Sequence, residues 1–378
     1  MALLTEEQVM IRDAARAWTQ EQSPVTAFRR MRDAGAGLGY EPAAYAEMCE
    51  MGWAGVVVPE ALGGSELGCL TMGLILEETG RTLAASPLLA SALAGATALV
   101  RGGSAAQKET YLPRIASGEL VAALAVDEGP RHAPERIALA AAKSGDGYVL
   151  TGEKTFVLEG MAAGLLIVAA RTSGAPGDAA GVSLFLVPAD AAGVTRTSLH
   201  LADSRGAADI RFAGVKVGAD AVLGAEGEGA SLLEAVLDRA RAGLCAEMLG
   251  MSLQAFEMTL EYLKTRVQFG QVIGGFQALQ HRAAKMYGEL ELSRSCVEAA
   301  LAACDQDAAD VAELVSAAKA KMGETLYLIS NELIQMHGGI GMTDAHDAGL
   351  YLKRARAVEA AFGGRAYHRD RFARLNGF

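Results

Sequence analysis

The segment YLKTRVQFGQVIGGFQALQ, residues 262–280, lies between two long stretches in which apolar residues recur every three or four positions. Such a period is typical of an amphipathic helix with one buried face. The stripe before the segment consists of Leu244, Met248, Met251, Ala255, Met258 and Tyr262, and the stripe after it of Phe276, Leu279, Ala283, Met286 and Leu290. A third stripe consists of Val311, Leu314, Ala318, Met322, Ile329, Leu333 and Met336. Three such helices predict a four-helix-type bundle over residues 223–378, with these stripes as its core.

Toward the N-terminus the pattern changes twice. Residues 1–120 are predicted to form a helical domain, in which Thr5, followed by Glu6, Glu7 and Gln8, supplies a helix N-cap. Residues 121–222 hold short apolar runs typical of strands, at 120–126, 137–142, 148–157, 165–170 and 182–187. Between two of them, Ser144-Gly145-Asp146-Gly147 favours a hairpin turn. The predicted fold class is α+β, with a helical N-terminal domain, a central antiparallel β-domain and a C-terminal helical bundle.

Charge and hydropathy exclude several classes of partner. The formal net charge of -11 disfavours nucleic acid or an anionic membrane as the main partner. The apolar stretch at 161–170 is interrupted by Gly164 and ends at Arg171, whereas a membrane span needs about 18 apolar residues. The first residues lack the basic region and apolar run of a secretory signal. We therefore expect no membrane span and a cytoplasmic location.

The sequence also lacks the motifs of common metal and nucleophile sites. Its five cysteines form no CxxC pair, and its six histidines form no HExxH motif. A GxSxG nucleophile elbow is absent as well. No metal site, disulfide framework or serine-hydrolase centre is predicted.

Two polar clusters are candidates for binding an anionic ligand. The first is the 262–280 corner, where Arg266 and backbone N–H groups could hold a phosphate. The second is QMHGGIGM, residues 335–342, whose glycines allow a backbone to approach a planar or phosphorylated ligand. On residue chemistry alone, a structural turn with a salt-bridged arginine is the favoured interpretation of the first cluster, and an ordinary helix C-terminus that of the second.

Together these clusters resemble the acyl-CoA dehydrogenase family, and the resemblance covers nearly the whole chain. MGWAGVVVPE at 51–60, with Gly63-Gly64, is similar to the family's N-terminal domain. GEKTFV at 152–157 is similar to its β-domain, and FAGVKV at 212–217, followed by Leu223-Gly224, to the strand that leads into its bundle. The order of helices, β-domain and helices is also the family's order.

The resemblance implies an oxidoreductase of fatty acid or steroid catabolism. A carboxylate removes the α-proton of an acyl-CoA thioester, the β-hydrogen passes as hydride to the flavin N5 of FAD, and a trans-2-enoyl-CoA is formed. The electrons then leave to an electron-transfer flavoprotein.

The resemblance also assigns residues to the cofactor and the substrate. Those that would reach FAD bound mainly by a neighbouring subunit are Arg266, Gln268, Phe269, Gln335, Gly338 and Gly339. Phe276 and Gln277 are further expected cofactor-binding residues. Phe156 and Val157 would flank the flavin ring of the chain's own site, and Val126 aligns with a flavin-binding position. Asp238 and Arg241 match the family's substrate-side Asp and Arg.

The chain departs from the family at the catalytic base. The family's Tyr-Glu-Gly-Thr motif corresponds here to Ala361-Phe362-Gly363-Gly364, and phenylalanine cannot take a proton. Some members carry the base at the position matching Ala240, which cannot take one either. Glu247 lies seven residues further along, on nearly the same helical face, and is the remaining candidate. A solvated or salt-bridged Glu247 is the alternative.

A second departure concerns the chain's own flavin site. Where the family has two hydroxyl side chains that hydrogen-bond the flavin, this chain has Val126 and His132. The groups offered to a neighbour's FAD are intact, whereas those of the chain's own site are eroded. This favours a hetero-oligomer with a separate catalytic subunit, as in enzymes of steroid side-chain breakdown. A self-sufficient homo-oligomer using Glu247, and a non-redox binding protein on the same fold, remain alternatives. An acyl-CoA oxidase is disfavoured because that branch is longer.

Overall fold

The computed structural model describes residues 4–35, 37–178 and 180–378. They pack into two compact units. The first contains the residues up to Arg29, Gly73–Ala84 and Arg241–Phe378, and the second contains Arg30–Met72 and Ala85–Ala240. The domain boundaries expected at residues 120 and 222 stay a prediction, because the two units group elements by packing rather than by type.

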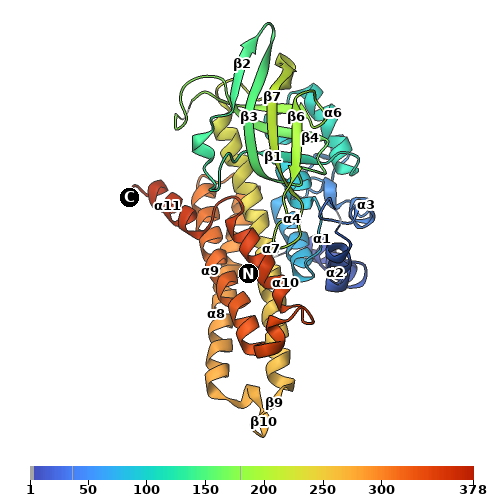
Figure 1. The fold of residues 1–378 in the computed structure, drawn as a ribbon, viewed down its shortest axis with the longest axis vertical. Helices are drawn as coiled ribbons and strands as arrows, with labels where there is room; N and C mark the ends of the chain where they lie inside the picture. The colour runs from blue at the N-terminus through green and yellow to red at the C-terminus, as the bar shows by residue number, and fades with distance from the viewer. Residues whose placement is uncertain (1–3, 36, 179) are drawn as a thin grey trace. The chain divides into compact units, whose positions relative to one another are not determined.

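Along the chain, a first group of helices is followed by a block of strands and then by a second group of helices (Figure 1). They are α1 (Glu6–Glu21), α2 (Val25–Ala34), α3 (Pro42–Glu50), α4 (Gly68–Arg81), α5 (Ala96–Gly102), α6 (Ala105–Ala116), α7 (Gly229–Thr265), α8 (Gln277–Asp305), α9 (Val311–His337), α10 (Ala348–Ala360) and α11 (Arg365–Leu375). Thr5 begins α1 with a capping box, in which its side chain accepts from Gln8 N and the Gln8 side chain caps in return. The predicted N-cap is therefore confirmed.

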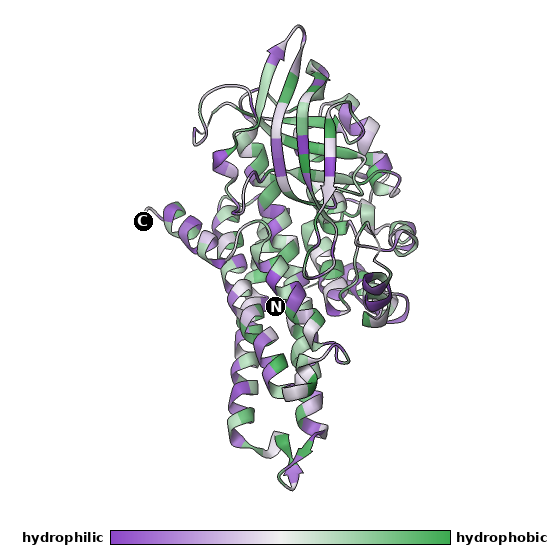
Figure 2. Ribbon diagram, in the orientation of Figure 1, coloured by the Kyte–Doolittle hydropathy of each residue, from purple (hydrophilic) through white to green (hydrophobic). Residues whose placement is uncertain are grey.

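The first unit contains the helical bundle. In Figure 1, α8 and α9 run side by side, and α10 and α11 also pack against α9. The predicted stripes are its core, since Met248, Met286 and Met322 are fully buried. Figure 2 shows hydrophobic and hydrophilic positions alternating along these helices, as expected when one face of each is buried. A hydrogen bond of 2.8 Å from Ser293 Oγ to Thr325 Oγ1 joins α8 to α9 inside this core.

The second unit contains the sheet. Its strands are β1 (Ala122–Ala125), β2 (Ala140–Ser144), β3 (Gly147–Leu158), β4 (Leu165–Arg171), β5 (Val182–Pro188), β6 (Val194–Ser198), β7 (Ala207–Gly218) and β8 (Val222–Leu223). The order is β6-β7-β3-β2-β4-β5-β8, with β1 beside β4. Ser144 pairs with Gly147, so the predicted hairpin is confirmed.

The sheet is mixed rather than antiparallel throughout, because β1 and β2 both run parallel to β4. The strand β6 was not expected from the sequence. Its residues, VTRTS, are mostly exposed and form no apolar run. Parallel pairing between distant segments likewise leaves no local signal in a sequence.

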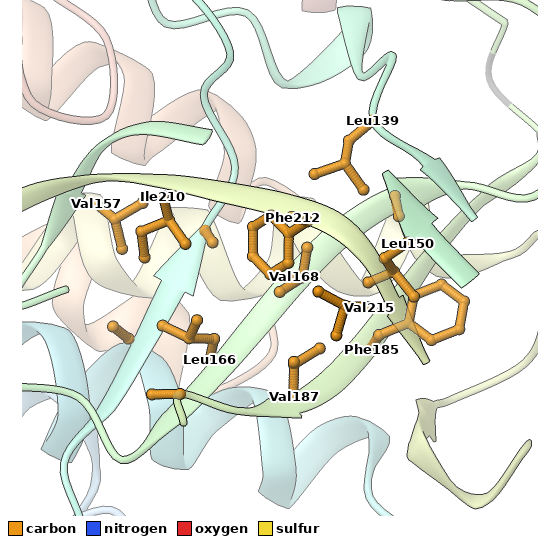
Figure 3. Close-up of a cluster of buried hydrophobic side chains, with 14 of the residues drawn as sticks. Leu139, Leu150, Val157, Leu166, Val168, Phe185, Val187, Ile210, Phe212 and Val215 are labelled. Atoms are coloured by element: carbon orange, nitrogen blue, oxygen red, sulfur yellow. The ribbon is translucent and has the colours of Figure 1, made fainter. Parts of the chain in front are cut away.

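One face of the sheet carries the core of this unit (Figure 3). Leu150, Val168, Phe185 and Phe212 are completely or almost completely buried there. The Tyr148 ring meets the Phe185 ring edge to face, with centroids 5.0 Å apart. The opposite side of β3, β6 and β7 presents threonines and charged side chains, and the pocket described below lies on that side.

Among the described residues, no helix is both long enough and apolar enough to cross a membrane.

Candidate functional site

The loop between α10 and α11, residues 361–364, occupies the position expected for the catalytic base. Phe362 has a φ of +54° and Gly363 a φ of +98°, so two consecutive residues are left-handed. For phenylalanine this backbone is unfavourable, and it persists only where surrounding contacts enforce it. The side chain at this position is a half-buried phenyl ring that cannot accept a proton.

Three fully buried side chains bind carbonyl groups of this loop and of the end of α10. Lys319 on α9 donates from Nζ to the carbonyl oxygens of Val358 (3.2 Å), Glu359 (3.0 Å) and Gly363 (2.9 Å). The Phe362 carbonyl oxygen lies 3.2 Å from Arg241 Nε and 3.0 Å from His368 Nε2. We call Lys319, Arg241 and His368 the carbonyl clamp.

The protonation of the clamp follows from its burial. Burial lowers the pKa of Lys319 to about 8, with Arg241 adding a smaller effect in the same direction against the opposing effects of Cys245 and Glu359. Burial, together with the charges of Arg241 and Lys319, lowers the pKa of His368 to about 2. His368 is therefore neutral, and its Nε2 carries the hydrogen that it donates to Phe362.

Asp238 and Arg241, the pair expected on the substrate side, are both buried. Besides its contact to Phe362, Arg241 reaches the Tyr367 hydroxyl at 3.4 Å and lies 5.7 Å from the centroid of its ring. Asp238, which belongs to the second unit, is also buried. The contact of Arg241 with the Phe362 carbonyl oxygen thus fastens the loop, and the substrate-binding role of the pair stays a proposal.

Glu247, the remaining candidate base, is engaged in a buried ion pair. Its Oε1 accepts from Arg354 Nε at 3.0 Å and from Arg354 Nη2 at 2.7 Å. The two side chains are 7% and 12% exposed. These two short contacts are charge-assisted hydrogen bonds that commit the carboxylate to Arg354. The salt-bridged alternative is the one that the geometry favours.

The residues assigned to a neighbour's cofactor gather at one end of the bundle. After α7, β9 (Val267–Gln268) and β10 (Gln271–Val272) form a hairpin, so the expected corner is a β-turn. Phe269 at this turn is 91% exposed and packs edge to face on Phe276. The residues Arg266, Gln268, Gln277, Gln335, Gly338 and Gly339 are all exposed. We call this set, with Phe269, the bundle tip.

A ring contact brings the two segments of the bundle tip together. Tyr262 on the last turn of α7 and His337 at the end of α9 have ring centroids 4.3 Å apart. His337 is followed by the short 3-10 turn η7 (Gly338–Met342). Gly338 has a φ of +63°, and an added Cβ at Gly338 or Gly339 would meet nothing within 4 Å. The backbone here is therefore open to an approaching ligand.

The second unit contains a pocket of about 580 Å³ beside the segment assigned to the chain's own flavin. Its charged lining consists of three carboxylates, those of Glu128, Glu153 and Asp209, and two cations, Lys154 and Arg211. Lys154 is fully buried and already binds Glu128 Oε1 at 2.7 Å and the Val126 carbonyl oxygen at 2.9 Å. Burial lowers its pKa to about 8 against the opposing charge of Glu128.

Around this pocket, polar side chains form hydrogen bonds with other groups of the protein. The Asp209 carboxylate accepts from the Thr155 hydroxyl and from Phe156 N. His132 points its Nδ1 at the Asp127 carboxylate, 3.0 Å from each oxygen. Val126 and Val157 are buried, and Val157 belongs to the core shown in Figure 3. Of the three residues assigned to the chain's own flavin site, Phe156 is the one that is only half-buried.

Comparison with known proteins gives these features a family. The acyl-CoA dehydrogenase N-terminal, middle and C-terminal domain models match residues 5–119, 132–215 and 227–375. The mitochondrial isovaleryl-CoA dehydrogenase of Pongo abelii is 32% identical over 395 residues, covering 97% of this chain and 90% of that protein. The chain therefore belongs to the acyl-CoA dehydrogenase family of oxidoreductases, and the predicted fold class is confirmed.

Two solved structures show the same fold over almost their whole length. The structure of glutaryl-coenzyme A dehydrogenase with glutaryl-CoA has a TM-score of 0.90 at 25% identity and covers 100% of this chain and 97% of that chain. The Tcur3481-Tcur3483 steroid ACAD has a TM-score of 0.88 at 29% identity and covers 98% of each chain.

Members of this family are FAD flavoproteins, so FAD is the cofactor implied for this chain. The bundle tip fits that group, because it offers an exposed guanidinium, amides and open glycine backbone to a diphosphate. The pocket beside Phe156 fits it less well, since its carboxylates outnumber its cations and Lys154 is already neutralised by Glu128. The two halves of a cofactor site are thus unequal in this chain.

Sequence reasoning missed two clamp residues, Lys319 and His368. Lys319 interrupts an apolar stripe, and a single buried lysine has no motif by which it could be found. The partnership of Glu247 with Arg354 was also not foreseeable, because the two residues are separated by 107 positions.

Proposed function

We propose that this chain is a subunit of an acyl-CoA dehydrogenase whose proton-abstracting carboxylate is supplied by a second, catalytic chain. The assembly converts an acyl-CoA thioester to a trans-2-enoyl-CoA and passes electrons to an electron-transfer flavoprotein. When bound, FAD accepts the β-hydrogen as hydride. This chain contributes the bundle tip to FAD held mainly by its partner. The cytoplasmic location stays a prediction.

The observation that carries the proposal is the state of the two candidate base positions. Position 362 holds a phenyl ring, and Glu247 is bound by Arg354. General-base catalysis needs an accessible acceptor within hydrogen-bond reach of the acidic α-carbon proton, and neither position supplies one. The unequal halves of the cofactor site support the same division of labour between two chains.

The proposed substrate class rests on the similarity of this chain to the relatives named above. The three relatives named above carry names for isovaleryl-CoA, glutaryl-CoA and steroid ACAD enzymes. On this similarity we propose a CoA thioester as the substrate.

The test is the flavin absorbance of the purified chain, alone and co-expressed with a candidate catalytic subunit, before and after addition of acyl-CoAs. We expect little flavin in the lone chain and substrate-dependent bleaching only in the mixture. About one FAD per chain in the lone protein, bleached by an acyl-CoA, would overturn the proposal in favour of a self-sufficient enzyme. A mixture without flavin would also contradict it.

A further inference from the structure

His337 and His346 stand at the two ends of the segment Gly338–Ala345, and their rings lie against each other. The ring centroids are 4.4 Å apart with an interplanar angle of 47°. His337 ends α9, whereas His346 lies two residues before α10. The Tyr262 ring also packs on His337, so the segment is closed on itself and joined to the end of α7. We call the two imidazoles the histidine pair.

Hydrogen bonds define the state of each ring. His337 Nδ1 lies 2.7 Å from the Leu333 carbonyl oxygen, which can only accept, so this nitrogen carries a hydrogen. His346 Nδ1 accepts from Ala348 N at 3.1 Å, so this nitrogen carries no hydrogen in the closed segment. Burial lowers the pKa of His337, and His346 lowers it further, against the opposing hydrogen bond to Leu333.

Protonation of His346 would disturb the closed segment in two ways. Its Nδ1 would change from an acceptor to a donor and would face the Ala348 N–H, which starts α10 and has no partner within the helix. The ring would also bring a positive charge against the buried His337, and a second protonation there would place two like charges together.

The neighbouring charges do not compensate for such a proton. Asp344 and Asp347 flank His346 in the sequence, and both are shared with Arg29 on α2: Asp347 Oδ1 lies 2.7 Å from Arg29 Nε, and Asp344 Oδ2 lies 3.4 Å from Arg29 Nη1. The element packed on the other side, α7, contributes the ring of Tyr262.

We infer that the histidine pair is an acid-sensitive fastening, which holds the segment Gly338–Ala345 closed when both rings are neutral and releases it on protonation. The segment contains Gly338 and Gly339 and directly follows Gln335. On the proposed function, its release withdraws part of the bundle tip from the neighbour's FAD.

Hydrogen exchange of the purified chain, followed by mass spectrometry at pH 7.5 and 5.5 and corrected for the intrinsic chemical rate, tests the fastening without a partner. An imidazole that is neutral in the closed segment and protonated in the open one raises the open population as the pH falls, by at most about tenfold for one ring between these pH values. We expect amides of residues 338–348 to exchange faster at pH 5.5, by up to that factor.

The variant His346→Asn isolates the titration. Its amide oxygen can accept from Ala348 N but takes up no proton in this range. We expect a smaller pH response in this variant, in which His337 is the remaining imidazole of the pair, and the full pH response in the control His281→Asn on the exposed face of α8. An unchanged wild-type protection, or a pH response of full size in His346→Asn, would overturn the inference.

A second measurement separates the fastening from the proposed function. Flavin retained by the co-expressed assembly is measured over the same pH range. Loss of FAD at pH 5.5 in the wild type but not in His346→Asn supports both. Faster exchange without loss of FAD keeps the fastening and rejects its link to the cofactor.

Discussion

Arg354 donates to Glu247 Oε1 twice, from Nε at 3.0 Å and from Nη2 at 2.7 Å. The pair is almost completely buried and joins α7 to α10 within the bundle. Taking two charges out of water is costly, so such a pair is stable only while both members are present.

Replacing Glu247 with glutamine therefore distinguishes a stabilising role of this residue from a role as catalytic base. Glu247→Gln leaves the Arg354 charge buried, and we expect the free energy of unfolding to fall by about 3 kcal/mol, measured by urea denaturation. The exposed Glu261→Gln on the same helix should change it by less than about 0.5 kcal/mol. A stable Glu247→Gln protein whose assembly loses acyl-CoA-dependent bleaching would instead identify Glu247 as the base.

The carbonyl clamp predicts an effect on the stability of the folded chain. Lys319→Met removes the donor for three carbonyl groups, and we expect a loss of about 2–4 kcal/mol in the free energy of unfolding. Lys321→Met, on the same helix but partly exposed, serves as the control. Equal stability of the two variants would show that the clamp does not support the loop.

The same lysine predicts a pH dependence. The pKa of Lys319 is about 8 in the folded chain and about 10.5 when unfolded, so between these values the unfolded state binds more protons and stability from this group rises with pH. The deficit of Lys319→Met relative to wild type should therefore grow from pH 8 to pH 10, by up to about 1.4 kcal/mol per pH unit. Parallel stability curves for the two proteins would contradict this assignment.

The bundle tip predicts an effect on assembly without an effect on the lone chain. Arg266→Ala removes an exposed guanidinium, so we expect less than about 0.5 kcal/mol change in the unfolding of the isolated chain but a lower FAD content in the co-expressed assembly. Lys264→Ala, also exposed at the end of α7, is the matched charge control. Equal flavin content in both variants would show that Arg266 of the bundle tip does not contribute to FAD binding.

Much of the fold could be predicted because its signals are local. The N-cap at Thr5, the hairpin at 144–147 and the stripes through Met248 and Met322 each depend on residues close together in the sequence. The parallel partners of β4 and the exposed strand β6 could not, since the first is a distant pairing and the second lacks an apolar run.

The candidate site divides in the same way. The loss of the base at Phe362 follows from a motif, whereas the clamp of Lys319, Arg241 and His368 comes from three helices that meet only in the folded chain. The ring contact between His337 and His346 likewise depends on the turn between them.

The carbonyl clamp has a consequence for how such a chain can change over time. All of its hydrogen bonds at position 362 end on the main chain, which every amino acid possesses. The backbone conformation of the loop therefore does not depend on which side chain stands at position 362. A single codon replacement at this position can remove or supply a carboxylate while the surrounding helices keep their hydrogen bonds, so catalytic chemistry and foldability can be inherited separately.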